Sequence, residues 1–552
     1  MSSRSRDTIV ARLLDQCSRH SAHAFCIHVA EDRHETITYG DLLQRSSVLA
    51  NALRAMGARP GKVVLIFEKH RPALYYAFIG SMLAGLVPSF MPYPNPKQHA
   101  GLFWQGHRAL LERIAPELLL VGPDLVDSFR SNLTQYSHLI VSTADIGQAD
   151  SGANDLAIAD DDIAFLQHSS GTTALKKGVM LSHRAVLDQI DAYSTAIGFC
   201  RQDVVVSWLP LYHDMGLIAC FMLTMITGAT LVALDPFAWV AAPTTLFDAI
   251  EQHRGTFCWL PNFAFNHLAM SARRGRSYNL STMRAFINCS EPCRAESFDA
   301  FLQRFADSGA TSRQLQVCYA MAENVFAVTQ TQVDQDPPRL QVDRAAFEAR
   351  HIALKGNGPT FLSCGKPVRS VVVRIVDDAG ALLPDGYVGE IAIASDFMFS
   401  GYQSQPQLTE SRLRAGWYYS GDLGFLHEGE LYVTGRKDDL LIVYGRNYYA
   451  HEIEAVAGKV EDIVPGRCVA FAIPNTMTGT SHAILIAESR GGTDQRRLVR
   501  RVREAILADC GLALHQVVLR EPGWLVKTTS GKISRELNRA RYIASTTEGP
   551  PL

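Results

Sequence analysis

The chain has 552 residues, of which 47% are hydrophobic and 20% are charged, and its formal net charge at pH 7 is −2. This length predicts more than one domain, and the composition is that of a globular protein with a large buried core. The near-neutral charge excludes the basic surface that is typical of nucleic-acid-binding proteins.

The cysteines and the first residues bear on the cellular compartment. The eleven cysteines are scattered and form no paired Cys-x-x-Cys pattern, so we expect reduced thiols and no structural zinc site. Residues 1–7 lack the apolar core of a secretory signal. Together these features predict a cytoplasmic protein.

The first third of the chain alternates between short apolar runs and helical patterns. Residues 62–67 and 118–121 are predicted strands, and the first is followed by an apolar helix that begins at Ala73. Residues 72–96 carry no charge and are long enough to suggest a membrane span, but four prolines interrupt them. A buried helix followed by a buried strand fits this stretch better, as in a parallel sheet covered by helices.

A loop rich in hydroxyl residues follows the apolar run at 163–166. It contains, in order, Ser169, Ser170, Gly171, Thr172 and Thr173, with Lys176 and Lys177 just behind. Glycine lets successive backbone N–H groups form an anion-binding concavity, and hydroxyls and lysines add donors, so the loop suits a triphosphate. A polar surface turn is the alternative. It is not the P-loop of nucleotide hydrolases, because Gly171 and Gly178 are seven residues apart and Val179 follows the second glycine.

The middle of the chain places polar residues directly after predicted strands. Residues 204–207 and 256–259 are strands, and the uncharged stretch 215–234 is interpreted as a buried helix that breaks before a strand. His213 follows the first of these strands, and such a lone histidine is more often structural than catalytic. Glu291 and Glu323 each follow an apolar run. If strand ends bring these acids together, they could hold Mg²⁺ and ribose hydroxyls; the alternative is that each is a solvated loop carboxylate.

From about residue 371 the pattern changes to alternating strands with tight turns. Residues 371–376, 389–394 and 430–434 are predicted strands of an antiparallel subdomain, and residues 417–424 form a turn with an exposed Asp422. The charged break at 435–440 is the candidate hinge. A smaller α/β unit follows, and its glycine loop at 526–535 carries Lys532; a solvated turn is the alternative for this loop.

Five motifs occur in the order that is found in the adenylate-forming superfamily of acyl-CoA synthetases, peptide-synthetase adenylation domains and luciferases, which the chain resembles over nearly its whole length. The motifs are the Ser/Thr/Gly loop, Tyr319-Ala-Met-Ala-Glu323, Ser420-Gly-Asp422, Gly435-Arg-Lys-Asp438 and Ser530-Gly-Lys532. The resemblance implies an α/β fold. A large domain, residues 1–436, has helix-covered parallel-type sheets and a barrel-like antiparallel subdomain at about 365–435. A small mobile α+β domain, residues 437–552, carries Lys532.

Within that superfamily the chain is most similar to the fatty acyl-AMP ligases. The similarity rests on residues 261–265, 288–296 and 440–447 and on an extra stretch at about 332–362. In that family an insertion at this place hampers the domain movement that coenzyme A requires, and the acyl group passes to the phosphopantetheine thiol of an acyl carrier protein. An acyl-CoA ligase is the alternative. A non-catalytic acyl or nucleotide binder is a third, against which the joint presence of Glu323, Asp422 and Lys532 argues.

The resemblance also assigns roles to residues, and these are expectations here. The cofactors would be ATP and Mg²⁺. The phosphates would be held by Ser169, Ser170, Gly171, Thr172, Thr173 and Lys177, the adenine by Ser290, Glu291, Pro292, Tyr319, Ala320 and Met321, and the ribose by Asp422 and Arg436. Glu323 would hold Mg²⁺, His213 would lie near the acyl carboxylate, Lys532 would bridge that carboxylate and the α-phosphate, and Asp438 would be the hinge.

Departures from the family pattern carry two further hypotheses. Cys289 and Ala320 stand where glycines are usual, which predicts a narrower acyl channel; a channel of unchanged bore is the alternative. Ala174 and Lys176 replace a usual glycine and proline. Residues 496–541 contain eleven Lys or Arg and four Asp or Glu, so this end of the chain could present a basic face to an acidic carrier protein, or simply a solvated helix.

Overall fold

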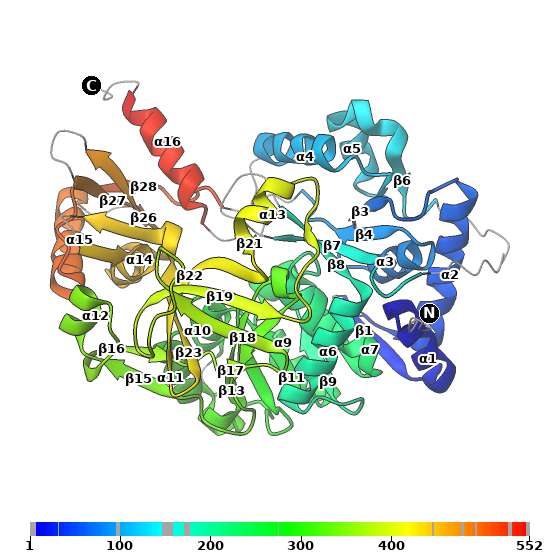
Figure 1. The fold of residues 1–552 in the computed structure, drawn as a ribbon, viewed down its shortest axis with the longest axis horizontal. Coiled ribbons are helices and arrows are strands. Elements are labelled where there is room, and N and C mark those ends of the chain that lie inside the picture. The colour runs from blue at the N-terminus through cyan, green and yellow to red at the C-terminus, as the bar shows by residue number, and fades with distance from the viewer. Residues whose placement is uncertain are drawn as a thin grey trace.

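The computed structural model describes residues 7–30, 33–94, 100–145, 158–169, 177–273, 275–443, 446–475, 480–491, 494–527 and 533–547. Two helix-covered sheets and an antiparallel subdomain make up most of the molecule, and a smaller α+β unit lies at one end (Figure 1). This architecture confirms the predicted α/β class with its antiparallel subdomain and small C-terminal unit.

The central sheet has nine strands in the order β17-β14-β13-β12-β11-β9-β10-β1-β2. The six strands from β13 to β1 in this order run parallel to one another, whereas β14 and β2 pair antiparallel to the two ends of that group. The strands are β1 (Ala24–Ala30), β2 (Arg33–Thr38), β9 (Val204–Ser207), β10 (Thr230–Leu234), β11 (Phe257–Leu260), β12 (Ala285–Asn288), β13 (Leu315–Ala320), β14 (Ala327–Gln330) and β17 (Lys366–Pro367). Strands β10, β11 and β12 are buried along their whole length, as continuous apolar runs in a doubly covered sheet should be.

Helices cover both faces of this sheet, and local sequence signals fix their ends. They are α1 (Ile9–His20), α2 (Tyr39–Ala55), α6 (His183–Ile197), α7 (Leu223–Thr227), α8 (Pro236–Ala241), α9 (Thr245–His253), α10 (Asn262–Ser271) and α11 (Ala295–Phe305). Helix α6, for example, begins at the N-cap Ser182, whose hydroxyl accepts from the N–H of Ala185, and ends at Gly198, which has a left-handed φ of 62°.

The second sheet is wholly parallel and has the order β4-β3-β5-β6. Its elements are β3 (Val63–Phe67), α3 (Ala73–Leu83), β4 (Val87–Phe90), α4 (Ala100–Ile114), β5 (Leu118–Val121), α5 (Val126–Asn132) and β6 (Ile140–Ser142). Within the uncharged stretch 72–96, residues 73–83 form a buried helix and residues 87–90 a buried strand, as predicted. None of the helices in the described part of the chain has the length and apolar character needed to cross a bilayer.

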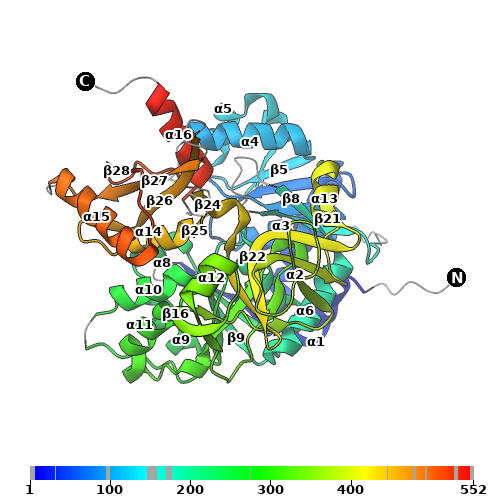
Figure 2. The same cartoon turned by 60° about the vertical axis from the view of Figure 1, so that its left-hand side comes forward.

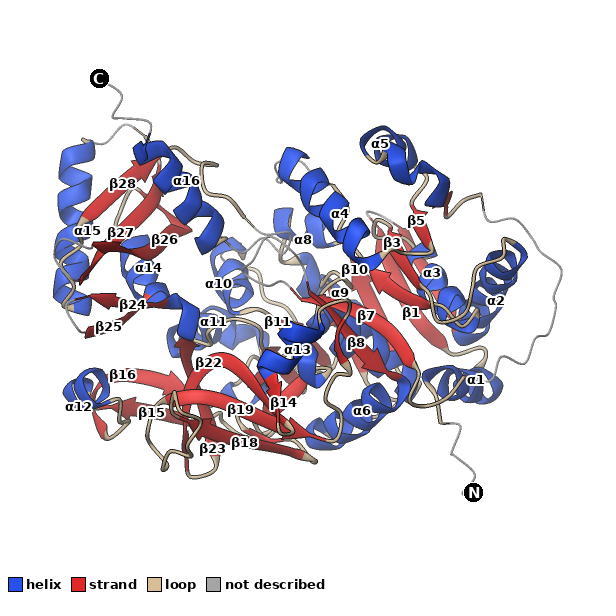
Figure 3. Cartoon of the chain, turned by 45° about the horizontal axis from the view of Figure 1, so that its top comes forward, coloured by secondary structure: helices blue, strands red, loops and turns tan. Residues whose placement is uncertain are grey.

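The antiparallel subdomain lies against the central sheet, and Figure 3 shows its strands stacked below the hairpin of β7 (Ile163–Ser169) and β8 (Lys177–Ser182). Its elements are β18 (Val371–Val376), β19 (Gly389–Ser395), β20 (Gly401–Tyr402), α13 (Pro406–Arg412), β21 (Leu413–Arg414), β22 (Trp417–His427) and β23 (Glu430–Arg436). Residues 417–424, predicted as a turn with an exposed Asp422, are instead strand, and Asp422 is buried. The prediction was wrong because Gly421, at φ 76°, looks like a turn residue, yet the strand pairs on both sides of it.

The stretch 332–362 folds as a hairpin with a short helix, and the chain then leads into the C-terminal unit. The hairpin elements are β15 (Arg339–Val342), α12 (Arg344–Arg350) and β16 (Lys355–Leu362). The C-terminal elements are β24 (Leu440–Val443), β25 (Arg446–Tyr449), α14 (Ala450–Gly458), β26 (Ile463–Asn475), β27 (Thr480–Ser489), α15 (Gln495–Cys510), β28 (Gln516–Arg520) and α16 (Arg535–Thr547). Helices α14 and α15 pack on one face of the sheet β26-β27-β28 and α16 packs on the other, so this unit has apolar cores of its own (Figure 2).

Candidate active site

Eight of the predicted site residues lie at the carboxyl edge of the central sheet. His213 follows β9, Ser290 and Glu291 follow β12, and Glu323 follows β13. Because these strands are parallel neighbours, their carboxyl ends meet at one edge, which is where open α/β sheets bind ligands. The fold therefore brings together residues that are about 110 positions apart in the chain.

The loop after β12 is shaped by an asparagine that the sequence reasoning did not single out as functional. The side-chain oxygen of Asn262 accepts hydrogen bonds from the Asn288 side chain at 2.9 Å and from the N–H of Arg294 at 3.0 Å. Within this loop Ser290 has a φ of 70°, which is unfavourable for a residue with a side chain and is typical of binding sites. The Glu291 carboxylate accepts from the N–H of Phe263 at 3.1 Å, and Pro292 is exposed.

Tyr319, Asp422 and Arg436 form a connected group beside this loop. The Tyr319 hydroxyl donates to one Asp422 oxygen at 2.6 Å, and Nε of Arg436 donates to the other at 3.0 Å. Strands β22 and β23 place Asp422 directly opposite Arg436. Burial and the Asp422 carboxylate raise the pKa of Tyr319 well above its ordinary value, so the phenol remains a donor. Each carboxylate oxygen has a second lone pair, so Asp422 can still accept from the two hydroxyls of a ribose.

Glu323 is also buried, with Lys177 and two tyrosines around it. The Tyr402 hydroxyl donates to a Glu323 oxygen at 2.6 Å and lies 3.1 Å from the Tyr418 hydroxyl. The Lys177 ammonium sits over the Tyr402 ring, 5.3 Å from its centre. Burial lowers the pKa of Lys177, and the Glu323 carboxylate opposes that shift. The result is a buried carboxylate and a nearby cation at the end of the hairpin of β7 and β8.

A strained turn presents Glu323 to the site. Val325, two residues later, has a φ of 60°, which a β-branched residue seldom adopts. The turn is held by Asn324, whose amide donates to the Ala327 carbonyl at 2.8 Å and accepts from the Ser395 hydroxyl at 2.6 Å. Backbone strain of this kind costs on the order of 1–3 kcal/mol and is concentrated at functional sites.

His213 lies in the loop between β9 and the π-helix η2 (Met215–Met222). Its N–H donates to the Pro210 carbonyl at 3.2 Å, and its ring lies 4.8 Å from the Tyr212 ring, edge to face. The Asp214 carboxylate caps the π-helix by accepting from the N–H of Met215 at 2.9 Å. Beside this loop lies a pocket with Met91, Tyr93, Leu209, Pro210 and Tyr212 in its wall.

Comparison with known proteins agrees with this geometry. The sequence family described as AMP-binding enzyme matches residues 13–403. The chain belongs to this family. It is an adenylate-forming ligase, and a protein of Mycobacterium tuberculosis named 4-hydroxyphenylalkanoate adenylyltransferase is 30% identical to it over 92% of this chain and 86% of the relative. The long-chain-fatty-acid–AMP ligase FadD26 of Mycobacterium marinum is 29% identical over 92% and 91% of the two chains.

Solved structures of AMP-binding enzymes share the whole fold. A fatty acyl-adenylate ligase structure, from a study of the E. coli and L. pneumophila proteins, has a TM-score of 0.91 at 26% identity and covers 99% of both chains. The L. pneumophila ligase in complex with acyl adenylate and pyrophosphate has a TM-score of 0.76 at 28% identity, over 98% of this chain and 96% of that one. The resemblance to fatty acyl-AMP ligases that the sequence indicated is therefore confirmed.

Several predicted residues of this AMP-binding enzyme fall outside the described part of the chain. Ser170, Gly171, Thr172 and Thr173 belong to the stretch 170–176, and Lys532 belongs to 528–532. The backbone of Ser169 ends β7, opposite Lys177. Ala320 and Met321 are half-buried beside Tyr319, and Asp438 lies, exposed, in a single 3-10 turn, Lys437–Asp439.

Proposed function

We propose that this ligase activates a fatty acid as its acyl-adenylate and then passes the acyl group to the phosphopantetheine thiol of an acyl carrier protein in the cytoplasm. The observation that carries the proposal is the meeting of the Tyr319–Asp422–Arg436 group with buried Glu323 at one sheet edge. Ribose hydroxyls and a magnesium-bound triphosphate require such a pair of acidic positions.

In the first half-reaction a carboxylate oxygen of the acid attacks the α-phosphorus of ATP, and pyrophosphate leaves. Ser290, Glu291, Pro292, Ala320 and Met321 would border the adenine, and Asp422 with Arg436 would hold the ribose. The loop from Ser169 to Thr173 and Lys177 would cradle the phosphates, and His213 would lie near the acid. No protein nucleophile is needed, since positioning and charge neutralisation do the catalytic work.

Glu323 is the residue that would hold Mg²⁺. Within the described ranges no group of three or more His, Cys, Asp or Glu side chains could bind a metal ion without other ligands. Mg²⁺ commonly binds through one or two carboxylates together with substrate phosphates and water, which suits a single buried carboxylate. When bound, the ion would offset the negative charge that builds on the phosphates.

Lys532 would bridge the carboxylate and the α-phosphate in this half-reaction only. We place the domain boundary between residues 436 and 437, so that rotation about Asp438 withdraws Lys532 before the thiol attacks the acyl carbon and AMP leaves. Lys532→Ala should slow adenylation about 10²–10³-fold, because it removes a positioned charge from the reacting phosphate, and should spare thiolation of pre-formed acyl-AMP. Adenylation and thiolation are measured separately. An equal loss of rate in both would contradict the proposed rotation that removes Lys532 before the second step.

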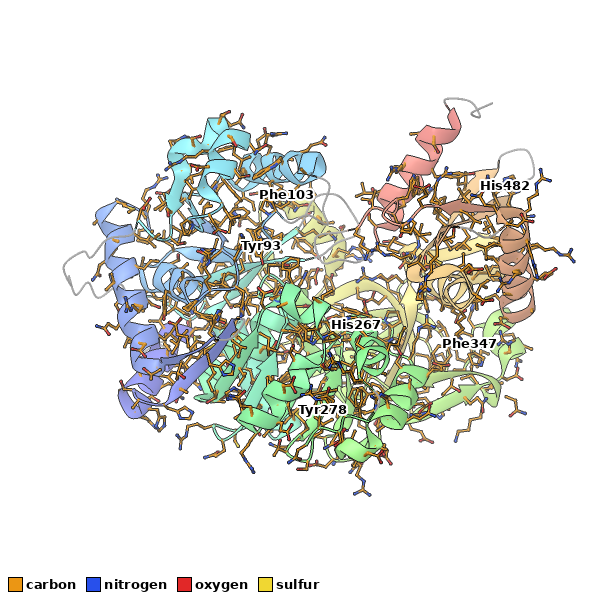
Figure 4. All side chains as sticks on the ribbon, turned by 180° about the vertical axis from the view of Figure 1, so that it is seen from behind. Tyr93, Phe103, His267, Tyr278, Phe347 and His482 are labelled. Atoms are coloured by element: carbon orange, nitrogen blue, oxygen red, sulfur yellow. The ribbon has the colours of Figure 1, made fainter. Side chains whose placement is uncertain are left out.

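The hairpin β15–β16 supports a carrier protein rather than coenzyme A as acceptor. Its residues Leu340, Val342 and Phe347 form one apolar cluster with Tyr449 of the C-terminal unit, and the Arg344 guanidinium donates to the Asp509 carbonyl at 3.2 Å. Figure 4 shows Phe347 beneath the C-terminal elements. These contacts join residues before and after the candidate hinge, so they would limit how far the C-terminal unit rotates about Asp438 and hamper the fuller movement that coenzyme A requires.

The decisive test supplies coenzyme A and a phosphopantetheine-bearing carrier protein to the same acyl-AMP, side by side. Carrier loading at least tenfold faster than acyl-CoA formation is expected. Equal rates would favour the acyl-CoA ligase, and Arg344→Ala should raise the coenzyme A rate, with Arg350→Ala on the same helix as control. A protein that releases no pyrophosphate with any acid would point to the non-catalytic binder.

Helix α15 is the candidate docking face for the acidic carrier. Arg496, Arg497, Arg500 and Arg503 are exposed along it, and Arg500 is partly offset by Glu504 at 2.7 Å. Complementary charge mainly raises the association rate and is screened by salt. Carrier loading at low carrier concentration should therefore slow several-fold between about 0.05 and 0.5 M salt, and in Arg500→Glu with Arg503→Glu. Insensitivity to both changes would remove α15 from the proposal.

Cys289 and Ala320 bear on the size of the acid. Cys289 is fully buried at the end of β12, and its sulfur accepts from the Ser290 hydroxyl at 3.7 Å, so little space surrounds it. We propose a channel that favours short, medium-length or otherwise specialised acids. Pyrophosphate release is compared for acids of about six to eighteen carbons, since packed interiors feel single methylene groups. A maximum at the longest acids, unchanged in Cys289→Gly and Ala320→Gly, would refute this.

A further inference from the structure

The two ends of the loop 528–532 are pinned by buried polar side chains. The Asn538 amide accepts from the N–H of Val526 at 2.9 Å and donates to the carbonyls of Val526 and Ser534 at 2.9 and 2.7 Å. The N–H of Ser534 in turn donates to the Val526 carbonyl at 3.0 Å, and Lys527 pairs with Ile533 as an antiparallel bridge. Asn538 is fully buried, so these hydrogen bonds are shielded from water.

A second buried group fixes the segment that enters the loop. The Glu488 carboxylate, at the end of β27, accepts from the N–H of Leu525 at 2.7 Å. Glu488 has no measurable exposure. The segment that enters the loop is thus joined to the sheet of the C-terminal unit by a hydrogen bond between the Leu525 backbone and the buried Glu488 side chain, which leaves this segment little freedom to move on its own.

Arg535, the first residue of α16, connects this base to the hinge. Its guanidinium pairs with Asp439, the residue after Asp438, and with the Glu454 carboxylate at 2.7 Å, and its Nε donates to the Ala470 carbonyl at 2.7 Å. The Arg535 side chain is 17% exposed. One planar fork therefore holds the 3-10 turn of the hinge, helix α14 and strand β26 at fixed distances from the loop.

We propose that Arg535 is a positioning residue for adenylation, because it ties the hinge turn to residues 525–527 and 533–535, which flank Lys532 in the chain, so that these segments move as one rigid unit. All three partners of Arg535 follow Asp438 in the chain. Rotation about Asp438 would therefore leave these contacts intact and would move the segments on both sides of Lys532 together with them. The inference rests on the proposed roles of Lys532 and Asp438. Without the fork the loop would arrive misplaced, and a misplacement of about 1 Å at a reacting centre costs on the order of 10²-fold in rate.

The test measures both half-reactions in the full-length chain. The acid is the one that gives the parent protein its fastest pyrophosphate release in the chain-length series. Arg535→Ala should reduce the adenylation kcat about 10²-fold with KM for ATP within about threefold, and should leave thiolation of pre-formed acyl-AMP within about threefold. Arg535→Lys keeps the charge but cannot reach three partners, so an intermediate loss of about 10-fold is expected. Asp439→Asn, which removes only the negative charge from the hinge contact, should lie near Arg535→Lys.

The control is Arg539→Ala, which removes an exposed arginine one turn further along α16 and should behave as the parent protein. An equal loss of rate in both half-reactions, or a wild-type rate of adenylation in Arg535→Ala, would refute the proposed positioning role of Arg535. If Arg535→Ala does not fold, Arg535→Lys and Asp439→Asn decide in the same way. Lys532→Ala is measured beside them in a chain with Arg535 intact. A normal rate of adenylation in Lys532→Ala would refute the proposed function of Lys532. This outcome is distinguishable from one in which only the role of Arg535 fails.

Discussion

Glu323 and Asp422 are each held by hydrogen bonds from neighbouring side chains. Tyr319 and Arg436 occupy both oxygens of Asp422, and Tyr402 donates to Glu323. Hydrogen bonds to a charged, buried partner contribute more than neutral ones, on the order of 1.5–3 kcal/mol each. These contacts fix the carboxylates before a nucleotide arrives, so little reorganisation remains for the reaction.

Tyr402→Phe removes the hydroxyl that orients Glu323 while keeping the ring under Lys177. We expect about a 10-fold weaker response to Mg²⁺, seen as a higher Mg²⁺ concentration for half-maximal pyrophosphate release, since one charge-assisted hydrogen bond is lost. Tyr419→Phe, on strand β22 with its ring beside Arg414, is the matched control and should match the parent protein. Unchanged Mg²⁺ dependence in Tyr402→Phe would show that Glu323 needs no such support.

The sequence predicted the candidate site residues that lie in compact motifs, but it did not predict the side chains that hydrogen-bond to them. Glu323, Tyr319 and Asp422 were predicted, because each follows an apolar run or sits in a short pattern. Tyr402 contacts Glu323 from 79 positions away, and an isolated tyrosine carries no local signal of that contact. The exposure of Asp422 was misjudged for the same reason, since what buries it is tertiary.

At the scale of elements, the loop from His213 into the π-helix depends on one glycine. A Cβ on Gly216 would lie 2.5 Å from the Pro210 carbonyl oxygen, a distance that real Cβ atoms do not reach. The loop and the start of the helix can therefore approach each other only because residue 216 has no side chain.

Gly216→Ala should displace the His213 loop and lower kcat/KM for the acid about 10–10²-fold, with a smaller effect on KM for ATP, because small misplacements near the reacting groups are costly. Gly458→Ala is the control, since a Cβ there meets its nearest neighbour, Gly466 N, at 3.8 Å. An unchanged kcat/KM for the acid would mean that the loop does not border the acid.

Apolar runs predicted the elements best where strands are buried on both faces. Residues 118–121 and 204–207 were predicted as strands and coincide with β5 and β9. The two-residue strand β20 and the long strand β22 were not predicted, since pairing with distant partners defines them rather than a local pattern. Helix types also escaped, because the π-helical start of the stretch 215–234 has no sequence signature that apolar periodicity reveals.

At the scale of the molecule, a buried histidine pair lies where the two parallel sheets meet. His28 of β1 and His70, which follows β3, stack with ring centres 4.0 Å apart, and His70 Nε2 is 3.2 Å from the Ala233 carbonyl of β10. Burial lowers the pKa of His28 to about 3 and that of His70 to about 4. Both rings are therefore neutral in the folded protein at neutral pH.

Acid should weaken this junction. Unfolded histidine titrates near pH 6.5, above both folded values, so the unfolded state binds more protons and stability falls as pH drops from about 6.5 towards 4. Each histidine contributes about 1.4 kcal/mol per pH unit in that window. Denaturant unfolding at pH values from about 7.5 to 5 should show a shallower loss in His28→Gln than in the parent. His138→Gln, at an exposed site, should not change the slope, and identical slopes in all three proteins would contradict the assignment.

Strand β20 carries Tyr402 into the same small sheet as the phosphate-loop hairpin, where it pairs with Val179 of β8. The carboxylate proposed for the metal and the loop proposed for the triphosphate therefore share one backbone framework. If nucleotide binding increases the affinity for the metal by a certain free energy, metal binding must increase the affinity for the nucleotide by the same free energy. This holds because the two orders of binding reach the same final complex. Saturation with either ligand should then tighten the other by one common factor, whichever is added first.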